Sequence, residues 1–415
     1  MEFKEAIIKL NESQHFPRNA TLSRMKEAIE RLNHPEKNLN FIHIAGTNGK
    51  GSVGALIKAG LKREKKSVGS FVSPHLIDIT ERITINNKQI SKEDFALIYT
   101  EVFSKTSDID LSFFEQLTLI ALVYFAEKKP DYIIWETGLG GRLDATTVVA
   151  PLISIITPIG LDHTKFLGED LYSIAKEKSF IIKPKTSVVV APQRDGLEDI
   201  FLERAKTVGA KITLAKDFLP IDLKMNGLSP AFVSFPKLKF QGVLPLLGRH
   251  QGTNALCAYL ALRELGVREL NSFELFSKAY WPGRLQYFPF LDLLVDGAHN
   301  EQAMESFMNF WKEERLAGKL IFATMGDKDY FTMVKQIDGY FEKVYLPKMN
   351  NKRAVAPETL TKLFKKTPCI ICENLEEALE LSVGKGFLAL VGSLYLVGEC
   401  LTIIEHKIDI KKRSY

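Results

Sequence analysis

The sequence predicts an α/β protein with a large N-terminal domain built on a mostly parallel sheet and a smaller, Rossmann-like C-terminal α/β domain. Three observations predict this fold class. Apolar runs of strand length alternate with longer stretches of helical spacing. A second series of this kind begins near residue 285. The length of 415 residues suggests two or three domains.

The N-terminal strands are expected in five short apolar runs, at residues 41–44, 68–72, 132–135, 152–156 and 187–190. Helical spacing lies between them, at 113–128 and 171–182. Continuous apolar strands joined by helices predict a parallel sheet that is covered on both faces. Around residues 231–243 the segments become short and alternating, which predicts a small antiparallel element.

The second α/β series follows Trp281-Pro282-Gly283-Arg284. Its strands are expected at residues 291–295, 320–323, 343–346, 369–372 and 387–391. We therefore predict two domains, at residues 1–284 and 285–415.

Composition and charge argue against some classes of function, namely nucleic-acid binding and membrane insertion. The net charge of +5 is spread along the chain, without the basic stripe interleaved with aromatic residues that is typical of nucleic-acid binding. The longest apolar stretch, residues 386–398, is too short to span a membrane and is followed by Glu399. Cys369 and Cys372 form a C-x-x-C pattern within a predicted buried strand, where the two thiols face opposite sides. We expect a soluble cytoplasmic protein that binds neither nucleic acid nor a membrane.

A glycine-rich loop follows the first strand and leads into a helix. It consists of Gly46, Thr47, Asn48, Gly49, Lys50, Gly51 and Ser52. Such a loop points backbone N–H groups at phosphate oxygens, and the helix N-terminus adds a favourable dipole. Lys50 supplies charge for the β- and γ-phosphates, and Ser52 offers a hydroxyl to Mg²⁺. The alternative, a tight turn with no ligand, leaves Lys50 unexplained.

Polar residues also follow two later strands. Glu136 ends one strand, and His163 follows the next. Each alone could be an ordinary loop residue, but together with the glycine-rich loop they predict a metal–phosphate site at the carboxyl edge of the sheet. Lys178, on the following helix, cannot be distinguished by composition from Lys176, and both are expected to be exposed.

The combined motifs resemble the folate branch of the Mur-ligase superfamily, the bacterial dihydrofolate synthase/folylpolyglutamate synthase family, over essentially the full length. The strings that carry the resemblance are Gly46–Ser52, Ser73-Pro74-His75-Leu76, Glu81-Arg82-Ile83, Phe113-Phe114-Glu115, residues 136–146, Gly160-Leu161-Asp162-His163-Thr164, His250-Gln251-Gly252-Thr253-Asn254-Ala255, Pro282-Gly283-Arg284, Asp296-Gly297-Ala298-His299-Asn300 and Gly392-Ser393-Leu394-Tyr395.

The resemblance implies an ATP-dependent ligase that adds L-glutamate to dihydropteroate, to the γ-carboxyl of tetrahydrofolate, or to both, through an acyl phosphate. It implies ATP as substrate, two Mg²⁺ ions and an N6-carboxylysine at Lys178. The implied catalytic residues are Lys50, His163, Lys178 and His299. The implied ATP-binding residues are Gly46, Thr47, Asn48, Gly49, Lys50, Gly51, Ser52, Asn254, Arg284 and Asp296, and the metal ligands are Ser52, Ser73, Glu136, His163 and the carboxylated Lys178.

The pterin-binding residues implied by the resemblance are Ser112, Phe113, Phe114, Glu115, Leu143, Asp144 and Ala145. We expect small-molecule substrates (pteroate or folate, L-glutamate and ATP) and a monomer. Two alternatives stay open at this point. One is a Mur-type ligase that acts on another carboxylate, and the other is a P-loop ATPase that hydrolyses ATP only to change shape.

Overall fold

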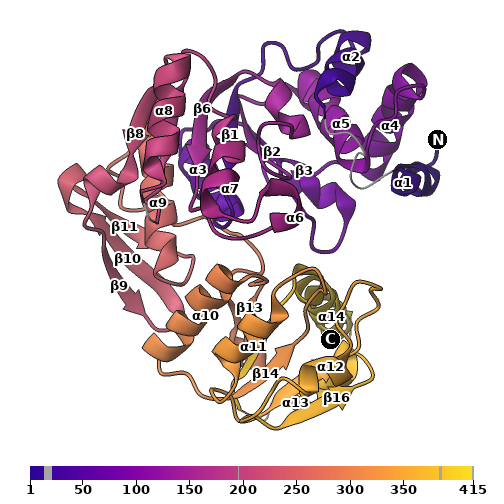
Figure 1. The fold of residues 1–415 in the computed structure, drawn as a ribbon, viewed down its shortest axis with the longest axis vertical. Coiled ribbons are helices and arrows are strands. Elements are labelled where there is room, and N and C mark those ends of the chain that lie inside the picture. The colour runs from indigo at the N-terminus through magenta and orange to yellow at the C-terminus, as the bar shows by residue number, and fades with distance from the viewer. Residues whose placement is uncertain (14–20, 195, 383–385, 414–415) are drawn as a thin grey trace. The chain divides into compact units, whose positions relative to one another are not determined.

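A computed structural model describes residues 1–13, 21–194, 196–382 and 386–413, with the side chains of 407–413 left out. The chain separates into two compact units (Figure 1). The N-terminal unit comprises Met1–Ile221, Ser234–Gly242 and Thr253–Ala279. The C-terminal unit comprises Asp222–Val233, Val243–Gly252 and Tyr280–Tyr415. The chain thus passes to the C-terminal unit twice before residue 280.

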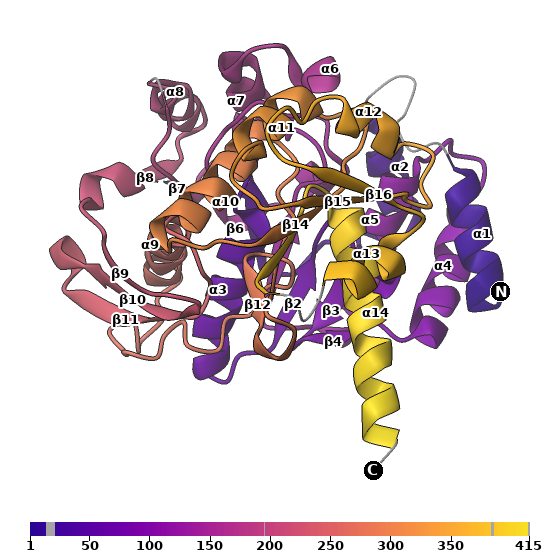
Figure 2. The same cartoon turned by 90° about the horizontal axis from the view of Figure 1, so that it is seen from below.

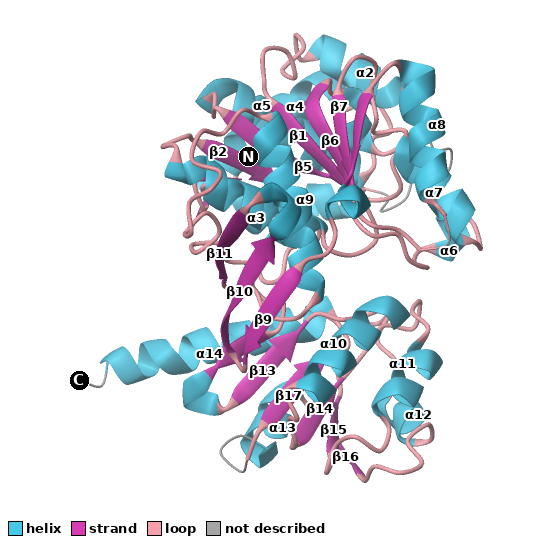
Figure 3. Ribbon diagram, turned by 90° about the vertical axis from the view of Figure 1, so that its left-hand side faces the viewer, coloured by secondary structure: helices cyan, strands magenta, loops and turns pink. Residues whose placement is uncertain are grey.

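The N-terminal unit contains an eight-stranded sheet with the order β4-β3-β2-β5-β1-β6-β7-β8. Its strands β2, β5, β1, β6 and β7 are labelled in Figure 3. The strands are β1 (Phe41–Ala45), β2 (Val68–Phe71), β3 (Ile83–Ile85), β4 (Lys88–Gln89), β5 (Tyr132–Glu136), β6 (Pro151–Ile156), β7 (Ser187–Val190) and β8 (Lys211–Leu214). The strands from β2 to β8 in this order pair in parallel, as predicted. β3 and β4 add an antiparallel edge.

Helices cover both faces of this sheet. They are α1 (Phe3–Glu12), α2 (Ser23–Arg31), α3 (Lys50–Arg63), α4 (Lys92–Thr106), α5 (Phe113–Lys128), α6 (Thr164–Leu167), α7 (Leu171–Ser179), α8 (Glu198–Val208) and α9 (His250–Glu264). One face carries Phe41, Phe71 and Trp135, which pack with the apolar residues of α4 and α5. On the other face Gly54 of α3 packs against Ile134. The helix predicted at residues 113–128 is confirmed.

A three-stranded sheet, β11-β10-β9, contains β9 (Asp222–Asn226), β10 (Ser229–Phe235) and β11 (Phe240–Leu244). The short connections between these neighbouring strands require antiparallel pairing, in agreement with the small antiparallel element predicted around residues 231–243. Its strands alternate buried and exposed side chains, as a sheet with one solvated face should.

The C-terminal unit contains a six-stranded sheet, β12-β13-β17-β14-β15-β16. Its elements are β12 (Gln286–Phe288), β13 (Leu293–Asp296), α10 (Glu301–Glu313), β14 (Lys319–Phe322), α11 (Tyr330–Ile337), β15 (Val344–Pro347), α12 (Pro357–Thr361), β16 (Cys369–Cys372), α13 (Leu375–Ser382), β17 (Leu388–Val391) and the long helix α14 (Leu394–Arg413; Figure 2). All pairs are parallel except that of β12 with β13.

The prediction of a buried strand at residues 369–372 was partly wrong. β16 is a strand, but it lies at the edge of the sheet, and Ile371 is 39 % exposed. An edge strand has one neighbour, so its side chains are less completely covered than those of central strands. Cys369 and Cys372 are free thiols.

None of the helices in the described part of the chain combines the length and the apolar character needed to cross a membrane.

Candidate active site

Four loops of the N-terminal unit meet at one edge of its sheet. β2, β5, β1 and β6 are adjacent and parallel, so their carboxyl ends lie along the same edge. Ser73 follows β2, Glu136 ends β5, the loop 46–52 follows β1, and residues 157–163 follow β6. This is the edge at which ligands bind in open α/β sheets.

Two glycines give the loop 46–52 its shape. A Cβ on Gly46 would lie 1.8 Å from Thr157 Oγ1, so only glycine fits there. Gly49 has φ +91°, a left-handed conformation, and a Cβ on it would lie 2.5 Å from Asn254 Oδ1. Asn254, which is 3 % exposed, therefore packs directly on the loop from α9.

The loop is also tied to the segment after β6. The N–H of Thr47 donates to Pro158 O (3.1 Å), and its hydroxyl donates to Gly160 O (3.0 Å). Gly160 N in turn donates to Thr47 Oγ1 (3.0 Å). These bonds fix the position of the loop relative to the predicted ligand His163. α3 then begins at Lys50, and the first N–H groups of a helix have no acceptors within the helix.

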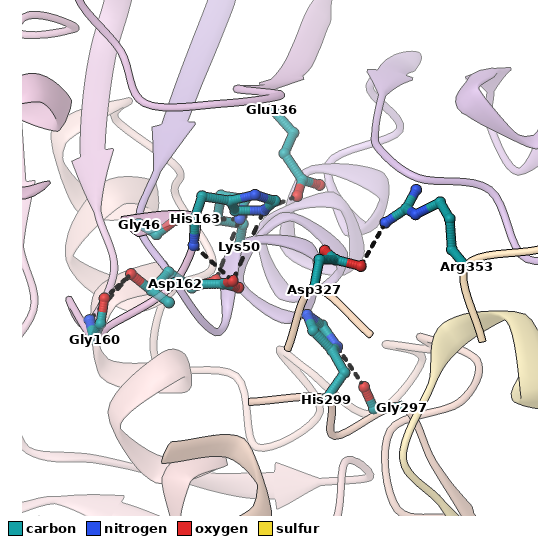
Figure 4. A network of polar contacts seen from close by, with 11 residues as sticks. Gly46, Lys50, Glu136, Gly160, Asp162, His163, Gly297, His299, Asp327 and Arg353 are labelled. Carbon is teal, nitrogen blue, oxygen red and sulfur yellow. Dashed lines mark hydrogen bonds and ion pairs between the residues drawn. The ribbon is translucent and has the colours of Figure 1, made fainter. Parts of the chain in front are cut away.

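Lys50 turns back over the loop. Its Nζ donates to Gly46 O (3.1 Å) and Thr47 O (3.3 Å), and it lies 3.8 Å from Glu136 Oε1 (Figure 4). Glu136 is 5 % exposed and Ser52 is 3 % exposed. A charged lysine, a carboxylate and a hydroxyl are thus gathered at the start of α3.

His163 lies at the start of α6 with φ +53°. Its side chain is 40 % exposed, and its Nε2 lies 3.9 Å from Asp162 Oδ1, which also accepts a hydrogen bond from His163 N (2.9 Å; Figure 4). The Asp162 side chain is only 12 % exposed. Asp162 was absent from the predicted ligand set, although it stands in the same Gly-Leu-Asp-His string as His163.

The expectation that Lys178 is exposed was wrong. Lys178 is 5 % exposed, whereas Lys176 is exposed as expected. Burial, with a smaller contribution from the charge of Lys50, lowers the pKa of Lys178 to about 7, although the carboxylates of Asp144, Asp162 and Glu136 oppose the shift. The helical pattern did not reveal this, because Lys178 is covered by a loop and not by a helix.

That covering loop is the glycine-rich turn after β5. A Cβ on Gly141 would lie 2.7 Å from Glu177 O and 3.0 Å from Lys178 Cα. Arg142 N donates to Glu177 O (2.9 Å), and Arg142 Nε donates to Glu177 Oε1 (2.9 Å). The absence of a side chain at Gly141 therefore allows the loop to close over Lys178.

Most of the side chains predicted to bind a pterin lie at the start of α5. Ser112 and Glu115 form a reciprocal cap, in which Ser112 N donates to Glu115 Oε2 (2.8 Å). Arg24 Nη2 donates to Glu115 Oε1 (3.4 Å). Phe113 is buried below the guanidinium of Arg82, which lies 5.5 Å from the ring centroid. The Glu115 carboxylate is thus committed to the cap and to Arg24.

Phe114 lies against the turn after Glu136. A Cβ on Gly138 would lie 2.5 Å from Phe114 Cζ. Asp144, in the other predicted pterin segment, accepts hydrogen bonds from Leu139 N (2.7 Å) and Thr146 N (3.0 Å). Burial raises the pKa of Asp144, while these bonds and the charge of Lys178 oppose the rise. Leu143 is half-buried and Ala145 buried on either side.

Ser73 is half-buried in the loop after β2, and its bond to Pro74 is cis. The loop that follows is held by Glu81, whose carboxylate accepts hydrogen bonds from Leu76 N (2.8 Å), Ile77 N (2.8 Å) and Asp78 N (2.7 Å). The structure therefore fixes this loop at the same sheet edge.

The predicted residues of the C-terminal unit also form a cluster. Asp296 ends β13 and accepts hydrogen bonds from Leu285 N (2.7 Å) and Ala298 N (2.8 Å). Burial raises the pKa of Asp296, and the charge of Arg284 opposes the rise. His299 Nδ1 donates to Gly297 O (2.7 Å), which leaves Nε2 as the acceptor of the neutral ring.

An ion pair in the same unit was not predicted. Arg353 Nη2 donates to Asp327 Oδ1 (2.9 Å; Figure 4). The two residues follow the parallel strands β15 and β14, so they belong to the carboxyl edge of this sheet. Asp327 stands in Gly326-Asp327-Lys328-Asp329, which could have been noted as a charged string after a strand.

The donor set of the N-terminal site suits Mg²⁺. No group of three His, Cys, Asp or Glu residues arranged to hold a metal was found in the described ranges. Mg²⁺ does not need one, because it is usually held by one or two carboxylates together with substrate phosphates and water. The buried carboxylate of Glu136, which lies 3.8 Å from Lys50 of the glycine-rich loop, meets that requirement.

A glycine-rich loop, a lysine and a buried acid at the carboxyl edge of a parallel sheet define an enzyme of the nucleotide-dependent α/β class. The chain belongs to the Mur ligase family, because the Mur ligase middle domain matches residues 44–262 and the Mur ligase, glutamate ligase domain matches residues 283–391. It is a ligase, as the resemblance implied.

The relatives point to one branch of this family. The chain is 32 % identical to a Bacillus subtilis dihydrofolate synthase/folylpolyglutamate synthase, over 91 % of this chain and 93 % of that protein. It is 31 % identical to a Saccharomyces cerevisiae dihydrofolate synthetase, over 92 % and 97 %. The resemblance to the folate branch is confirmed.

Solved structures agree in fold. A Mycobacterium tuberculosis folylpolyglutamate synthase complexed with ADP has a TM-score of 0.87 and 25 % identity, covering 97 % of this chain and 98 % of the other. A bifunctional folylpolyglutamate synthase/dihydrofolate synthase from Yersinia pestis, complexed with AMPPNP and Mn ion, has a TM-score of 0.85 and 25 % identity, covering 98 % of each chain.

Proposed function

We propose that this Mur ligase uses ATP to attach L-glutamate to dihydropteroate, to the γ-carboxyl of tetrahydrofolate, or to both. The observation that carries the proposal is the convergence of Lys50, Glu136 and Asp162-His163 beside the loop 46–52 at one sheet edge. The names of the relatives, including those crystallised with ADP or AMPPNP, support the choice of substrates.

The reaction needs an activated carboxylate, because a free carboxylate does not react with an amine at neutral pH. An oxygen of the acceptor carboxylate attacks the γ-phosphorus of ATP, and ADP leaves. The α-amine of glutamate then attacks the carbonyl carbon of the acyl phosphate, loses a proton, and expels inorganic phosphate. Lys50 offsets charge on the phosphoryl group while it is transferred.

We assign the remaining roles in the N-terminal unit as follows. The N–H groups of residues 46–52 hold the phosphates, and Asn254 positions that loop and contacts the nucleotide. Ser52, Ser73, Glu136 and His163 are the protein ligands of Mg²⁺, which when bound would offset phosphate charge and orient the γ-phosphoryl group. Phe114 and the other residues of the segments 112–115 and 143–145 line the pterin pocket.

Lys178 is assigned a carboxylated side chain. The ammonium first loses one proton. The neutral amine then attacks CO₂, a C–N bond forms, and a second proton is released, so that the original cation becomes an anion able to hold a second Mg²⁺. Burial beside Lys50 favours this change, since both reduce the stability of a charged ammonium. The carbamate also gives Lys50 a second anionic neighbour.

The C-terminal unit is assigned the rest of the reaction. We propose a domain boundary between residues 284 and 285, with Arg284 and Asp296 contacting the nucleotide. His299 is assigned to the phosphates or to the incoming glutamate. The buried Asp296 and the oriented imidazole of His299 support these roles.

We also propose that the enzyme is a cytoplasmic monomer. All four cysteines are free thiols, as is usual in a reducing compartment. Light scattering at assay concentration tests the monomer.

The substrate assignment is tested by phosphate release from ATP, with and without L-glutamate, comparing dihydropteroate with tetrahydrofolate as acceptors. Glutamate-dependent release with both acceptors, together with a glutamyl product seen by mass spectrometry, would establish both steps. Release with one acceptor would assign a single step. Release with neither would direct the search to another carboxylate.

A further inference from the structure

A row of three polar side chains crosses the middle of the N-terminal sheet. Trp135 on β5, His43 on β1 and Ser154 on β6 are partners in register, so their side chains project from the same face. Each has no exposed surface. Buried polar atoms need hydrogen-bond partners, and these three find theirs in segments that cross the sheet face.

Two of the three hold Thr146. His43 Nε2 lies 2.9 Å from Thr146 Oγ1, and Trp135 Nε1 donates to Thr146 O (2.9 Å). The Thr146 hydroxyl itself donates to Asp144 Oδ1. A hydroxyl has one proton, so His43 Nε2 must carry the proton and act as the donor to Thr146. The result is a buried donor chain from His43 through Thr146 to Asp144.

The third side chain holds the segment that follows Lys178. Ser154 Oγ donates to Ile181 O (2.7 Å), just beyond the end of α7. Thr147 Oγ1 donates to Gly141 O, and Gly141 in turn lies against the backbone of Lys178. Ser154 thus anchors the segment after Lys178, and Thr147, next to Thr146, anchors the Gly141 turn against the Lys178 backbone.

The burial of His43 reduces the stability of the fold, which suits a residue that is present for function. His43 Nδ1 is buried and has no hydrogen-bond partner in the part of the chain that the structure describes. An apolar residue at this position would avoid the cost of an unpaired buried nitrogen. Sites where the local rules of packing are broken in this way tend to serve function.

We propose that Thr146, held by His43, is a positioning residue of the ligase reaction. Its hydroxyl fixes the Asp144 carboxylate, and Asp144 N in turn donates to Gly141 O (3.3 Å). Through Asp144, Thr146 therefore helps to set where the Gly141 turn holds Lys178 relative to Lys50 and Glu136. The inference rests on the proposed function, because positioning matters only if these groups act on the phosphates. A displacement of about 1 Å at such a site can cost about a hundredfold in rate.

Matched variants separate positioning from packing. Thr146→Val keeps the shape and removes the hydroxyl, whereas Thr146→Ser keeps the hydroxyl. The control is Ser70→Ala on β2, because Ser70 is 4 % exposed and its Oγ has no partner among the described residues. If Thr146→Val does not fold, His43→Leu replaces it, with His43→Gln as the variant that retains an N–H donor.

The first readout is steady-state ligation well below the unfolding temperature. Thr146→Val should lower kcat by about tenfold or more, with KM for ATP changed by less than about threefold. Thr146→Ser and Ser70→Ala should stay within about threefold of the original kcat. Full kcat in Thr146→Val, or an equal loss in Ser70→Ala, would overturn the proposal.

The second readout does not depend on turnover. The reactivity of the Lys178 amine toward an acylating reagent, followed by mass spectrometry, should rise in Thr146→Val toward that of the exposed Lys176. Unchanged reactivity would overturn the positioning role. Failure of the proposed function gives a separate result. In that case the unaltered protein would show no glutamate-dependent release of phosphate, whatever the reactivity of Lys178.

Discussion

Lys50 Nζ lies 3.8 Å from Glu136 Oε1, and this pair joins the first residue of α3 to the last residue of β5. The two side chains are 17 % and 6 % exposed. A cation and an anion are therefore placed side by side at the phosphate-binding edge before any ligand arrives.

Lys50→Met should reduce kcat for ligation by at least about a hundredfold, because the charge that offsets the transferring phosphoryl group is lost. Steady-state phosphate release measures this effect. Lys62→Met is the control, since Lys62 is exposed near the far end of the same helix and should leave kcat unchanged. A Lys50→Met enzyme with normal turnover would disprove the phosphate role.

Gly49→Ala should weaken ATP binding by about tenfold or more, because φ +91° disfavours a side chain by about 1–2 kcal/mol and the new Cβ would displace Asn254. Calorimetric titration with a non-hydrolysable ATP analogue measures it. Gly209→Ala is matched, because Gly209 also has positive φ but open space around it. Gly209→Ala should lower the stability of the fold and leave the affinity for ATP unchanged. Equal ATP affinity in Gly49→Ala and Gly209→Ala would contradict the prediction.

Lys178 should carry a carbamate in bicarbonate buffer. With ¹³C-bicarbonate, the protein should show a carbamate carbon signal by NMR that Lys178→Met lacks and Lys176→Met retains, because only Lys178 is buried. Lys178→Met should also lose most ligase activity. A signal that persists in Lys178→Met would assign the carbamate elsewhere.

The stability of the fold should fall as pH drops below 6.5. Burial, with a smaller contribution from the charge of Lys183, lowers the pKa of His43 to about 3, against 6.5 in the unfolded chain. Between these values the unfolded state binds the extra proton, so each unit of falling pH costs about 1.4 kcal/mol in unfolding free energy.

Urea unfolding at pH 5 and pH 6 tests this. The loss between the two pH values should be about 1 kcal/mol smaller in His43→Gln than in the original protein. His75 and His250, whose pKa values burial lowers to about 4, contribute in the same direction in both proteins and cancel in the comparison. Equal losses would show that His43 does not titrate as described.

The sequence was sufficient for the elements whose signal is local. The strand bounds at residues 187–190 and 369–372 and the helix at 113–128 were predicted to the residue, since apolar runs and helical spacing define them. The antiparallel strands β3 and β12 were missed, because each has only three residues and leaves almost no periodicity.

The residues of the site likewise fall into those that the sequence predicted and those that it did not. The spacing of glycine and lysine was enough to predict the loop 46–52, and the position of Glu136 at the end of a predicted strand was enough to predict its place in the site. The burial of Lys178 was not readable, since it depends on Gly141 approaching from a distant loop. The donor chain from His43 to Asp144 was equally hidden, because it joins residues about a hundred positions apart.

The central claim is that the acceptor carboxylate is activated by phosphoryl transfer at this site, and oxygen labelling tests it most directly. The enzyme is given ATP, glutamate and dihydropteroate or tetrahydrofolate whose reacting carboxylate carries ¹⁸O. One labelled oxygen should appear in the released phosphate, because the oxygen that attacks phosphorus leaves with it. Phosphate without label, released in step with ATP loss, would mean that water attacks ATP and that the ligase mechanism is wrong.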